Sequence, residues 1–491
     1  MDNESFHKEQ AEKVPQDCDL GEGVKGSLQS VTIEDVDSLE TVAAALAKEV
    51  QTRNQEIAYL NFELGTALKR ASLTNEIGQA VFASRRSLTR FFKLPFDLMK
   101  IRKKYRKRSA KRFVPTIRDY TPADADSMKK TVLFMCTNGG GLGHLTRSLA
   151  IAKRMKRLVP DWEFIFLSTS PALSTIRREG FKAYYLPPHA QLEPAVTSHR
   201  WNILLRNTLN DLFALYNFSV VIFDGAYPYA ALVNEISGQE RLYKIWVKRG
   251  SAREKARLLR DKQDKFFDRI IAPEEAGRSE EGTTDREVKV SPIILLDESD
   301  LWTREEVRTM LKIPQDKKVC YIQLGAGNIN DIDSDIHQIV KSLRKRRDVM
   351  MIVGESIIGS ELKLIEDDII VLKDYPNSKY VRGFDLCVSA CGYNSFHELM
   401  YFGVPTLFIP NMNTVTDDQY ARAVAAEESG CGIVMTELSE ESLDQAFNLL
   451  CDSDENRKMS ENRIKFENGA MQAAELLVLS HPRMRKSYEI S

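Results

Sequence analysis

The sequence lacks the features that would mark a membrane-spanning, secreted or zinc-binding protein. Its 491 residues contain no apolar run that approaches the roughly 18 residues of a membrane span. The polar start MDNESFHKEQ has neither the basic nor the apolar region of a signal peptide. The seven cysteines form no CxxC pair and have no metal-like spacing with the seven histidines. We therefore expect a reduced, cytoplasmic chain without structural zinc, whose membrane contact is peripheral.

The chain also lacks a net charge of one sign. Its 69 Lys and Arg balance 70 Asp and Glu to a formal net charge of -1, which argues against a nucleic-acid binder defined by global charge. At 491 residues the chain exceeds the size at which a single hydrophobic core stops growing. Two domains with additional elements are therefore expected.

The first 114 residues differ in character from the rest. Residues 1–35 are polar and acidic, which predicts disorder, and residues 36–114 are predicted to be helical. A loose heptad pattern over 43–71 contains small residues and places Arg53 at a seam position, which argues against a long stable coiled coil. The pattern fits a helix packed on its own protein as well as one that binds a partner or forms an oligomer.

A basic segment follows at residues 85–112. It has thirteen Lys or Arg and one acid, Asp97, interleaved with bulky apolar residues such as Phe91, Phe92 and Phe96. This mixture favours an interfacial helix on an anionic membrane surface, where each nearby basic residue contributes about 1 kcal/mol. The alternative is a solvated basic linker. An RNA-binding arm would need a companion RNA motif, and none is apparent.

Beyond Pro122 the pattern alternates between buried strands and helices. The sequence LTRSLAIAKRMKRLV predicts a helix with Leu145, Leu149, Ala152 and Met155 on its apolar face. Two successive series of this kind predict two doubly wound, Rossmann-like domains, 128–292 and 293–480, with ligands outside the carboxyl ends of their strands. The predicted strands are TVLFMCT, EFIFLST, KAYYLP, SVVIFD, YKIWVK and DRIIAP in the first series, and KVCYIQLG, VMMIVG, IIVLKD, LCVSA and PTLFIP in the second.

The loop NGGGLGH at 138–144 is the first candidate site. It joins a predicted strand to a predicted helix, so its backbone can approach a ligand closely and the helix start favours negative charge. It matches neither GxxxxGK[ST] nor a complete GxGxxG. His144, with Arg147 one turn later, can act as a general base, or can make a structural hydrogen bond at the helix start.

The second candidate site lies in SACGYNSFHELMYFGVPTLFIPNMNTVTDDQYARA. Gly392 turns the chain, Asn394 or Ser395 can cap a helix, and that helix carries Glu398. A carboxylate can accept two hydrogen bonds from a ribose, while a helix start can hold a diphosphate. Taken alone, Glu398 would be an ordinary exposed helix residue and the sequence DDQ at 417–419 an ordinary helix cap.

The second segment resembles the donor domain of glycosyltransferase family 28, the group that contains the peptidoglycan N-acetylglucosaminyltransferase. GGGLGHLTRSLAIAKRM resembles the N-terminal glycine loop of the same group. The resemblance covers residues 130–480 and implies a GT-B fold: two Rossmann-like domains facing a cleft, here preceded by the helical and basic extension. It also implies a hexosyltransferase that uses a nucleoside-diphosphate sugar, with UDP the best match, and inverts the anomeric carbon.

The resemblance further implies roles for individual residues. Glu398 would bind the ribose, Asp418 and Gln419 would contact the sugar, and His144 would lie beside the acceptor hydroxyl. Groups that approach phosphate are implied at both glycine loops: Gly325, Gly327, Gly392, Asn394 and Ser395 on the donor side, and Gly140, Gly141, Gly143 and Arg147 on the acceptor side. Members of the family need no cofactor and no bound metal, and the sequence has no DxD placed for a nucleotide-bound cation in the matching region; we interpret DID at 331–333 and DAD at 124–126 as chance occurrences in loops.

The residues leave several functional alternatives open. GLGHLTRSLAIA also resembles nucleotide-sugar hydrolases of the pseudaminic acid pathway, sugar epimerases share the fold, and a non-catalytic GT-B partner subunit is a third class. The extension before residue 115 favours transfer to a lipid-linked or cell-surface polysaccharide acceptor at the inner face of the membrane. The base would be His144 or Asp224, which ends a predicted strand and could otherwise simply cap a turn.

Overall fold

The structure, a computed structural model, describes residues 97–100, 130–137, 141–192, 196–248, 263–275, 286–325, 332–359, 368–413 and 417–490. The chain divides into two units, Met1–Thr121 and Pro122–Ser491. In the first unit, residues 97–100 are helical. The predictions for 1–35, for 43–71 and for the rest of 85–112 lie outside the described residues. Among the helices of the described ranges, none has the length and apolar character needed to cross a membrane.

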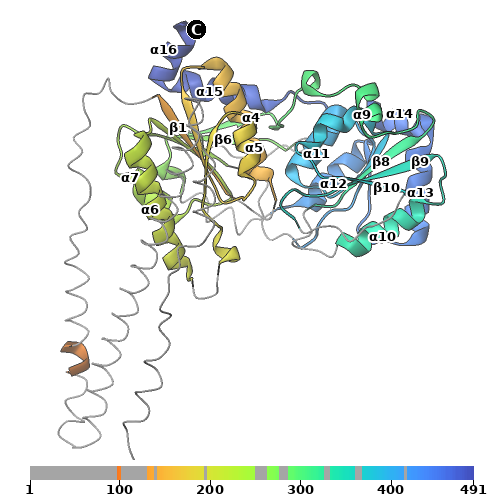
Figure 1. Ribbon diagram of the computed structural model, residues 1–491, viewed down its shortest axis with the longest axis horizontal. Coiled ribbons are helices and arrows are strands. Elements are labelled where there is room, and N and C mark those ends of the chain that lie inside the picture. Colours follow the sequence, from red (N-terminus) through yellow and green to blue (C-terminus); the bar gives the residue numbers. More distant parts are fainter. Residues whose placement is uncertain are drawn as a thin grey trace, which may run out of the picture. The chain divides into compact units, whose positions relative to one another are not determined.

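The second unit contains two parallel β-sheets, which confirms the predicted pair of doubly wound halves (Figure 1). We call the first sheet with its helices the first lobe. Its strand order is β3-β2-β1-β4-β5-β6-β7. The strands are β1 (Thr131–Cys136), β2 (Glu163–Ser168), β3 (Lys182–Tyr185), β4 (Val220–Asp224), β5 (Tyr243–Val247), β6 (Arg269–Pro273) and β7 (Glu287–Val290).

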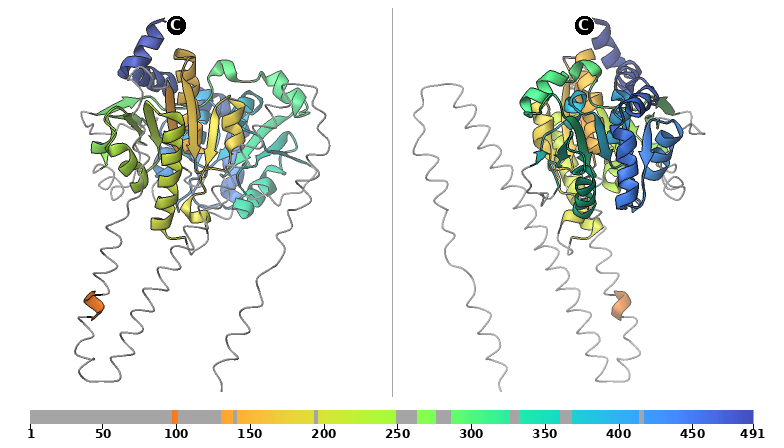
Figure 2. Two further views of the ribbon diagram at one scale, coloured as in Figure 1. Left: turned by 60° about the vertical axis from the view of Figure 1, so that its left-hand side comes forward. Right: turned by 90° about the vertical axis from the view of Figure 1, so that its right-hand side faces the viewer.

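Helices cover both faces of this sheet because its strands are apolar on both sides (Figure 2). Phe134 of β1 belongs to the core cluster under α4 and α5, whereas Leu133 belongs to the cluster under α6 and α7. All four residues of the predicted apolar face of α4 are buried. The helices are α4 (Gly143–Leu158), α5 (Leu173–Arg178), α6 (Ser198–Tyr216) and α7 (Ala230–Ser237).

The second sheet with its helices forms the second lobe, with the strand order β10-β9-β8-β11-β12-β13. Its strands are β8 (Lys318–Gln323), β9 (Val349–Gly354), β10 (Ile369–Leu372), β11 (Leu386–Ser389), β12 (Thr406–Phe408) and β13 (Gly432–Val434). One core cluster lies under α10 (Ile332–Leu343) and α13 (Glu440–Cys451), and another includes residues of α11 (Tyr393–Phe402) and α12 (Gln419–Glu428). The remaining helices of this lobe are α9 (Arg304–Met310) and α14 (Ser453–Glu461).

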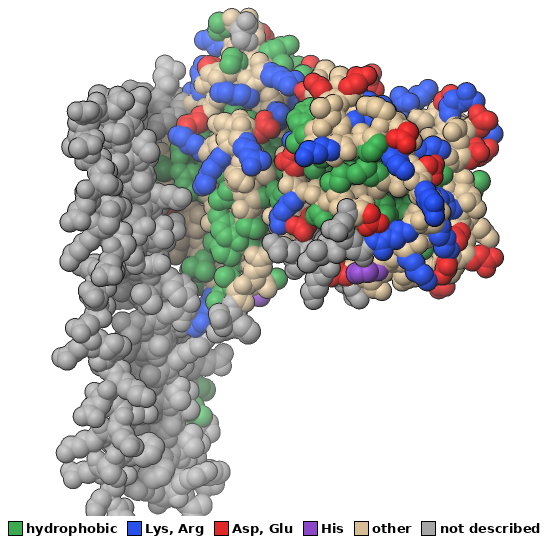
Figure 3. Space-filling view, turned by 45° about the vertical axis from the view of Figure 1, so that its right-hand side comes forward, with side chains coloured by type: hydrophobic (Ala, Val, Ile, Leu, Met, Phe, Trp, Pro, Cys, Tyr) green, Lys and Arg blue, Asp and Glu red, His purple; other side chains and the backbone are tan. Residues whose placement is uncertain are grey.

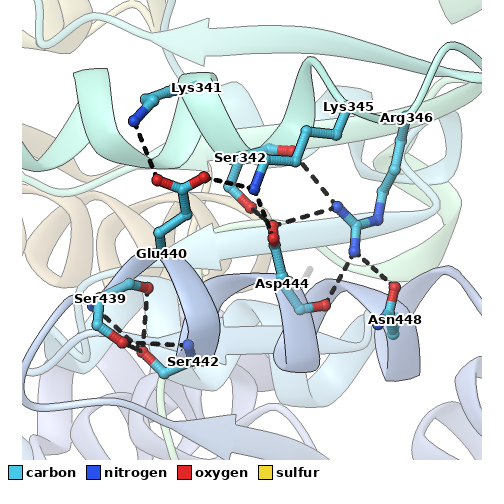
Figure 4. Close-up of polar contacts among 9 residues, drawn as sticks. All are labelled: Lys341, Ser342, Lys345, Arg346, Ser439, Glu440, Ser442, Asp444 and Asn448. Atoms are coloured by element: carbon cyan, nitrogen blue, oxygen red, sulfur yellow. Dashed lines mark hydrogen bonds and ion pairs between the residues drawn. The ribbon is translucent and has the colours of Figure 1, made fainter.

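A network of charged side chains joins α10 to α13 above their apolar contact (Figure 4). Lys345 Nζ lies 2.8 Å from Glu440 Oε1 and 2.5 Å from Asp444 Oδ2. Ser342 Oγ donates to Asp444 Oδ1 at 2.5 Å, so Lys345 and Ser342 together lower the pKa of Asp444. Solvent screens exposed ion pairs so that each adds little to stability, and the network chiefly fixes how the two helices are aligned.

The chain passes between the lobes twice, and the two passages are bonded to each other. Residues 291–297 lead out of the first lobe, while α15 (Gly469–Ser480) returns and packs against α4, followed by α16 (Pro482–Ile490). Gly469 N donates to Pro292 O at 2.9 Å. A Cβ on Gly469 would lie 1.9 Å from Ser291 O, so this close approach requires glycine.

The surface of the described residues mixes charges of both signs. Figure 3 shows basic and acidic side chains interspersed over one face of both lobes. This pattern contrasts with residues 85–112, where the sequence concentrates thirteen basic residues against one acid.

Candidate functional site

The two candidate segments of the sequence meet at the carboxyl ends of the strands. β1 pairs with β4 in parallel, with Cys136 opposite Asp224, so the glycine loop after β1 begins beside Asp224. In the second lobe β11 lies between β8 and β12, and the turns after β11 and β12 are therefore neighbours. Carboxyl ends of parallel strands are where doubly wound sheets bind ligands.

His144, Asp224 and Arg147 form one hydrogen-bonded group. His144 Nδ1 lies 2.7 Å from Asp224 Oδ1, and Arg147 Nε donates to Asp224 Oδ2 at 2.9 Å. Ser148 Oγ also reaches Asp224 Oδ2, at 3.4 Å. The Asp224 side chain is fully buried, whereas 12% of the His144 side chain is exposed. The carboxylate therefore orients an imidazole that is itself open to the site.

Two opposing effects act on the ionisation of Asp224. Burial raises the pKa of its carboxyl group, but Arg147 and then His144 outweigh burial and lower it below its usual value. Asp224 consequently stays ionised and accepts from His144 Nδ1, which leaves Nε2 as the basic nitrogen of the ring. The Arg147 guanidinium is buried and forms an ion pair with Asp224, while its predicted contact with phosphate stays a prediction.

The start of α11 faces the first glycine loop. Gly392 is the N-cap of α11, and Asn394 Nδ2 donates to Gly143 O at 3.3 Å. A Cβ on Gly392 or on Gly143 would meet no other atom within 4 Å, so protein packing does not require glycine at either position. The space beside these two backbones is available to a ligand, and the helix start favours an anionic one.

Glu398 lies on α11, one turn beyond Asn394. Burial raises the pKa of its carboxyl group to about 7. Tyr375 and Tyr321 are close enough for the charge of Glu398 to raise the pKa of both phenols. This carboxylate is more than an exposed helix residue, because its surroundings disfavour its charge and a hydrogen-bonding ligand would favour it.

A cavity of about 190 Å³ is lined by both lobes. Pro171 and Ala172 line it from the first lobe, and Ile357, Ile358 and Tyr375 line it from the second. The Tyr375 hydroxyl also lies 2.9 Å from Thr146 Oγ1 of α4, which ties the two walls together. Tyr375 therefore both lines the cavity and contacts the helix that follows the first glycine loop.

The turn after β12 has its own set of contacts. Asp418 is the N-cap of α12, with Oδ1 accepting from Ala421 N at 3.1 Å. Gln419 Oε1 accepts from Asn411 N at 3.0 Å, and Asp417 forms an ion pair with Arg422. Asp418 thus caps α12 through Oδ1, and the sugar contacts of Asp418 and Gln419 stay predictions.

Of the other predicted site residues, some lie in the part of the chain that the structure describes and two lie outside it. Gly325 has φ of 103°, a conformation that favours glycine, Gly141 has open space beside it, and Ser395 is half-buried on the first turn of α11. Gly140 and Gly327 lie outside the described residues. Among His, Cys, Asp and Glu residues of the described ranges, no three are grouped so that they could hold a metal ion.

Three buried residues of the site were not predicted: Tyr393, Glu275 and Arg422. Tyr393 opens α11, its ring lies 5.5 Å from the Arg147 guanidinium, and its hydroxyl accepts from Ile293 N at 3.2 Å. Arg422 Nε donates to Glu275 Oε2 at 2.7 Å. The sequence signal that could have found Glu275 is an acidic residue near the carboxyl end of a buried strand. Glu275 lies two residues beyond the end of β6, and Asp224 is the last residue of β4.

A family model accounts for the second lobe. Residues 324–477 match the model described as "Glycosyltransferase family 28 C-terminal domain". This part of the chain is similar to glycosyltransferase family 28. The chain is also 24% identical over 323 residues to the UDP-N-acetylglucosamine--N-acetylmuramyl-(pentapeptide) pyrophosphoryl-undecaprenol N-acetylglucosamine transferase of Acetivibrio thermocellus, covering 61% of this chain and 84% of that relative. Both matches support the predicted resemblance to a family 28-like glycosyltransferase.

Solved structures place the family 28 domain and its partner lobe in a GT-B fold. The glycotransferase of kitacinnamycin matches with a TM-score of 0.51 at 16% identity, covering 71% of this chain and 98% of that one. A UDP-N-acetylglucosamine 2-epimerase of Listeria monocytogenes, described as putative, matches with a TM-score of 0.50 at 12% identity, covering 73% and 97%. Because a transferase and an epimerase both match, the shared fold does not choose between the two reactions.

Proposed function

We propose that this glycosyltransferase moves a hexose-type sugar from UDP to a hydroxyl of a lipid-linked or cell-surface polysaccharide acceptor, with inversion and without a metal. The observation that carries the proposal is the His144–Asp224 pair at 2.7 Å, placed beside the start of α11. A buried carboxylate that orients a partly exposed imidazole is the arrangement expected of a general base. The relative from Acetivibrio thermocellus, whose printed name includes UDP-N-acetylglucosamine and a pyrophosphoryl-undecaprenol acceptor, supports the choice of donor and acceptor class.

In the proposed reaction His144 Nε2 removes the proton from the acceptor hydroxyl as its oxygen attacks the anomeric carbon. The new C–O bond forms on the face opposite to the bond that breaks, and that bond's electron pair leaves with the β-phosphate of UDP. Asp224 holds the ring in the tautomer that leaves Nε2 basic and stabilises the imidazolium that forms. Asp224 is too deeply buried to reach an acceptor, so its role is to position His144 rather than to serve as the base.

The donor would lie along α11. The diphosphate would accept hydrogen bonds from the backbone around Gly392 and from Asn394 and Ser395 at the positive end of the helix. Glu398 would accept hydrogen bonds from the ribose hydroxyls. The uracil base of the donor would enter the cavity that Tyr375 lines. Gln419 would contact the sugar through its amide nitrogen, because its carbonyl oxygen is held by Asn411 N.

The proposal is tested by incubating the purified chain with a panel of nucleotide sugars and following the products by mass spectrometry. We expect one UDP-sugar to be retained, and release of UDP to accelerate at least tenfold when a lipid-linked acceptor is added. Rapid hydrolysis that no acceptor accelerates would instead favour the hydrolase alternative. Stable binding to a second transferase without any turnover would favour a partner subunit.

We also propose that residues 85–112 hold the enzyme at an anionic membrane surface, where a lipid-linked acceptor would be found. Thirteen basic residues interleaved with aromatic and aliphatic ones support this proposal.

Deleting residues 85–112 is expected to abolish cosedimentation with vesicles that contain anionic lipid, because both the basic charge and the apolar anchors are lost. Transfer to a small soluble acceptor should remain within about twofold of the full chain, since the predicted site residues begin at Gly140, well after the deleted segment. Vesicles of zwitterionic lipid serve as the control for charge. Equal sedimentation of the full and the shortened chain with anionic vesicles would contradict the anchor.

A further inference from the structure

Arg422 stands at the point where three separate segments meet. Its Nε donates to Glu275 Oε2 at 2.7 Å, Nη1 donates to Cys391 O, and Nη2 forms an ion pair with Asp417. Cys391 precedes the N-cap of α11, Asp417 precedes the N-cap of α12, and Glu275 follows β6 of the first lobe. One planar guanidinium therefore fixes both donor-side turns and attaches them to the other lobe.

The burial of this group is unusual for a contact that only stabilises a fold. The side chains of Arg422 and Glu275 are both 0% exposed. Burial alone would lower the pKa of Arg422, but Glu275 and Asp417 outweigh it and raise that pKa, so the cation persists. A well-packed apolar pair is often as stabilising as a buried ion pair. An apolar pair could not, however, direct hydrogen bonds to a backbone carbonyl and two carboxylates at fixed angles.

We infer that Glu275 and Arg422 are positioning residues for the donor site: the first lobe, through Glu275, orders the turns of the second lobe that hold the diphosphate and the sugar. This inference rests on the proposed function, which assigns those two turns to the donor. Its consequence is that donor affinity depends on the contact between the lobes. Glu275 lies 147 residues from Arg422 in the chain and belongs to the first lobe, whereas Gly392, Asn394, Ser395, Glu398 and Gln419 lie in the second.

A second contact between an arginine and a carboxylate provides a matched control. Arg154 of α4 is 1% exposed, and its Nη2 lies 2.7 Å from Asp297 Oδ2 in the segment that leads into the second lobe. Asp297 also accepts from Asn468 Nδ2 at 2.7 Å. This pair links the same two parts of the chain but makes no contact with the turns at Cys391 or Asp417 in the bonds described. Breaking it should lower stability without disturbing the donor site.

The test compares Glu275→Gln with Asp297→Asn in the full chain. Hydrogen–deuterium exchange is measured first without ligand. We expect the Gln variant to exchange at least five times faster at the backbone amides of 390–396 and 417–422, both in the second lobe, while the Asn variant leaves these amides unchanged. UDP affinity, measured by calorimetry, should then fall about tenfold in the Gln variant and less than twofold in the Asn variant.

The outcomes separate this inference from the proposed function. If both variants melt at lower temperature but neither changes exchange in the two turns, Glu275 is only structural and the inference fails. If the unaltered chain does not bind UDP, the proposed function fails, and the exchange measurement still decides whether Glu275 orders the turns. Arg422→Lys should reproduce the faster exchange, because an ammonium group cannot make the same planar set of contacts.

Discussion

Replacing His144 by alanine is expected to lower turnover by about 10²- to 10⁴-fold, because the acceptor hydroxyl then loses the group that removes its proton. The UDP dissociation constant should change less than threefold, since the residues assigned to the donor lie on α11 and after β12. Steady-state kinetics with the donor and acceptor found by the mass-spectrometric screen, together with calorimetric titration of UDP, measures both quantities. A variant that turns over normally would remove His144 from the chemistry.

Two further variants distinguish the imidazole from its surroundings. Asp224→Asn should lower turnover by about 10²-fold or more while keeping the shape of the site, because an amide no longer holds the ring in the required tautomer or stabilises the imidazolium. His337→Ala is the control, since His337 is exposed on α10 and its Nδ1 bonds to Asp333 O. An Asn variant as active as the unaltered chain would show that Asp224 has no part in orienting the base.

Replacing Glu398 by alanine is expected to weaken UDP binding by about 10- to 100-fold at pH 8, as two hydrogen bonds to a charged group are lost. Calorimetry measures the loss, and Glu428→Ala, an exposed position at the end of α12, provides the control. Unchanged UDP affinity in the Glu398 variant would contradict the assignment to the ribose.

The pH dependence of binding gives a separate test of Glu398. Its carboxyl group has a pKa of about 7 in the unliganded protein, and it must be ionised to accept from both ribose hydroxyls. Affinity for uridine, which carries no phosphate to titrate, should therefore rise from pH 6 to pH 8 and then level off. Glu398→Gln should abolish this rise.

Because folding favours the protonated form of Glu398, stability falls as pH rises through 7. The Gln variant should therefore melt at a higher temperature than the unaltered chain at pH 8.

Most of the architecture could be predicted from the sequence because long buried strands of a parallel sheet are apolar throughout. β1 and β9 are six-residue runs of this kind, and helix α4 shows a clear apolar face. The sequence analysis missed β7 and β13. β7 has the four residues EVKV and β13 has the three residues GIV, so both are too short to show a period. Both lie at sheet edges, where pairing with a neighbour decides the conformation more than local pattern does.

The candidate site was predictable where function depends on contiguous residues and unpredictable where it depends on distant ones. The glycine loop with His144, and the run from Gly392 to Gln419, are each visible as short segments. Asp224 was named as an alternative base because it ends a strand, but its burial and its bond to Arg147 depend on how α4 crosses β4. The pairing of Glu275 with Arg422 follows from the meeting of two lobes, which no local pattern encodes.

The double passage of the chain between the lobes determines how they can move. Residues 291–297 and the segment before α15 are joined by Gly469 N to Pro292 O, and by Asn468 Nδ2 to Asp297 Oδ1. Two chain segments bonded side by side resist twisting in a way that a single linker does not. A rotation of one lobe against the other about the long axis of this connection should therefore cost more than it would across a single strand of chain.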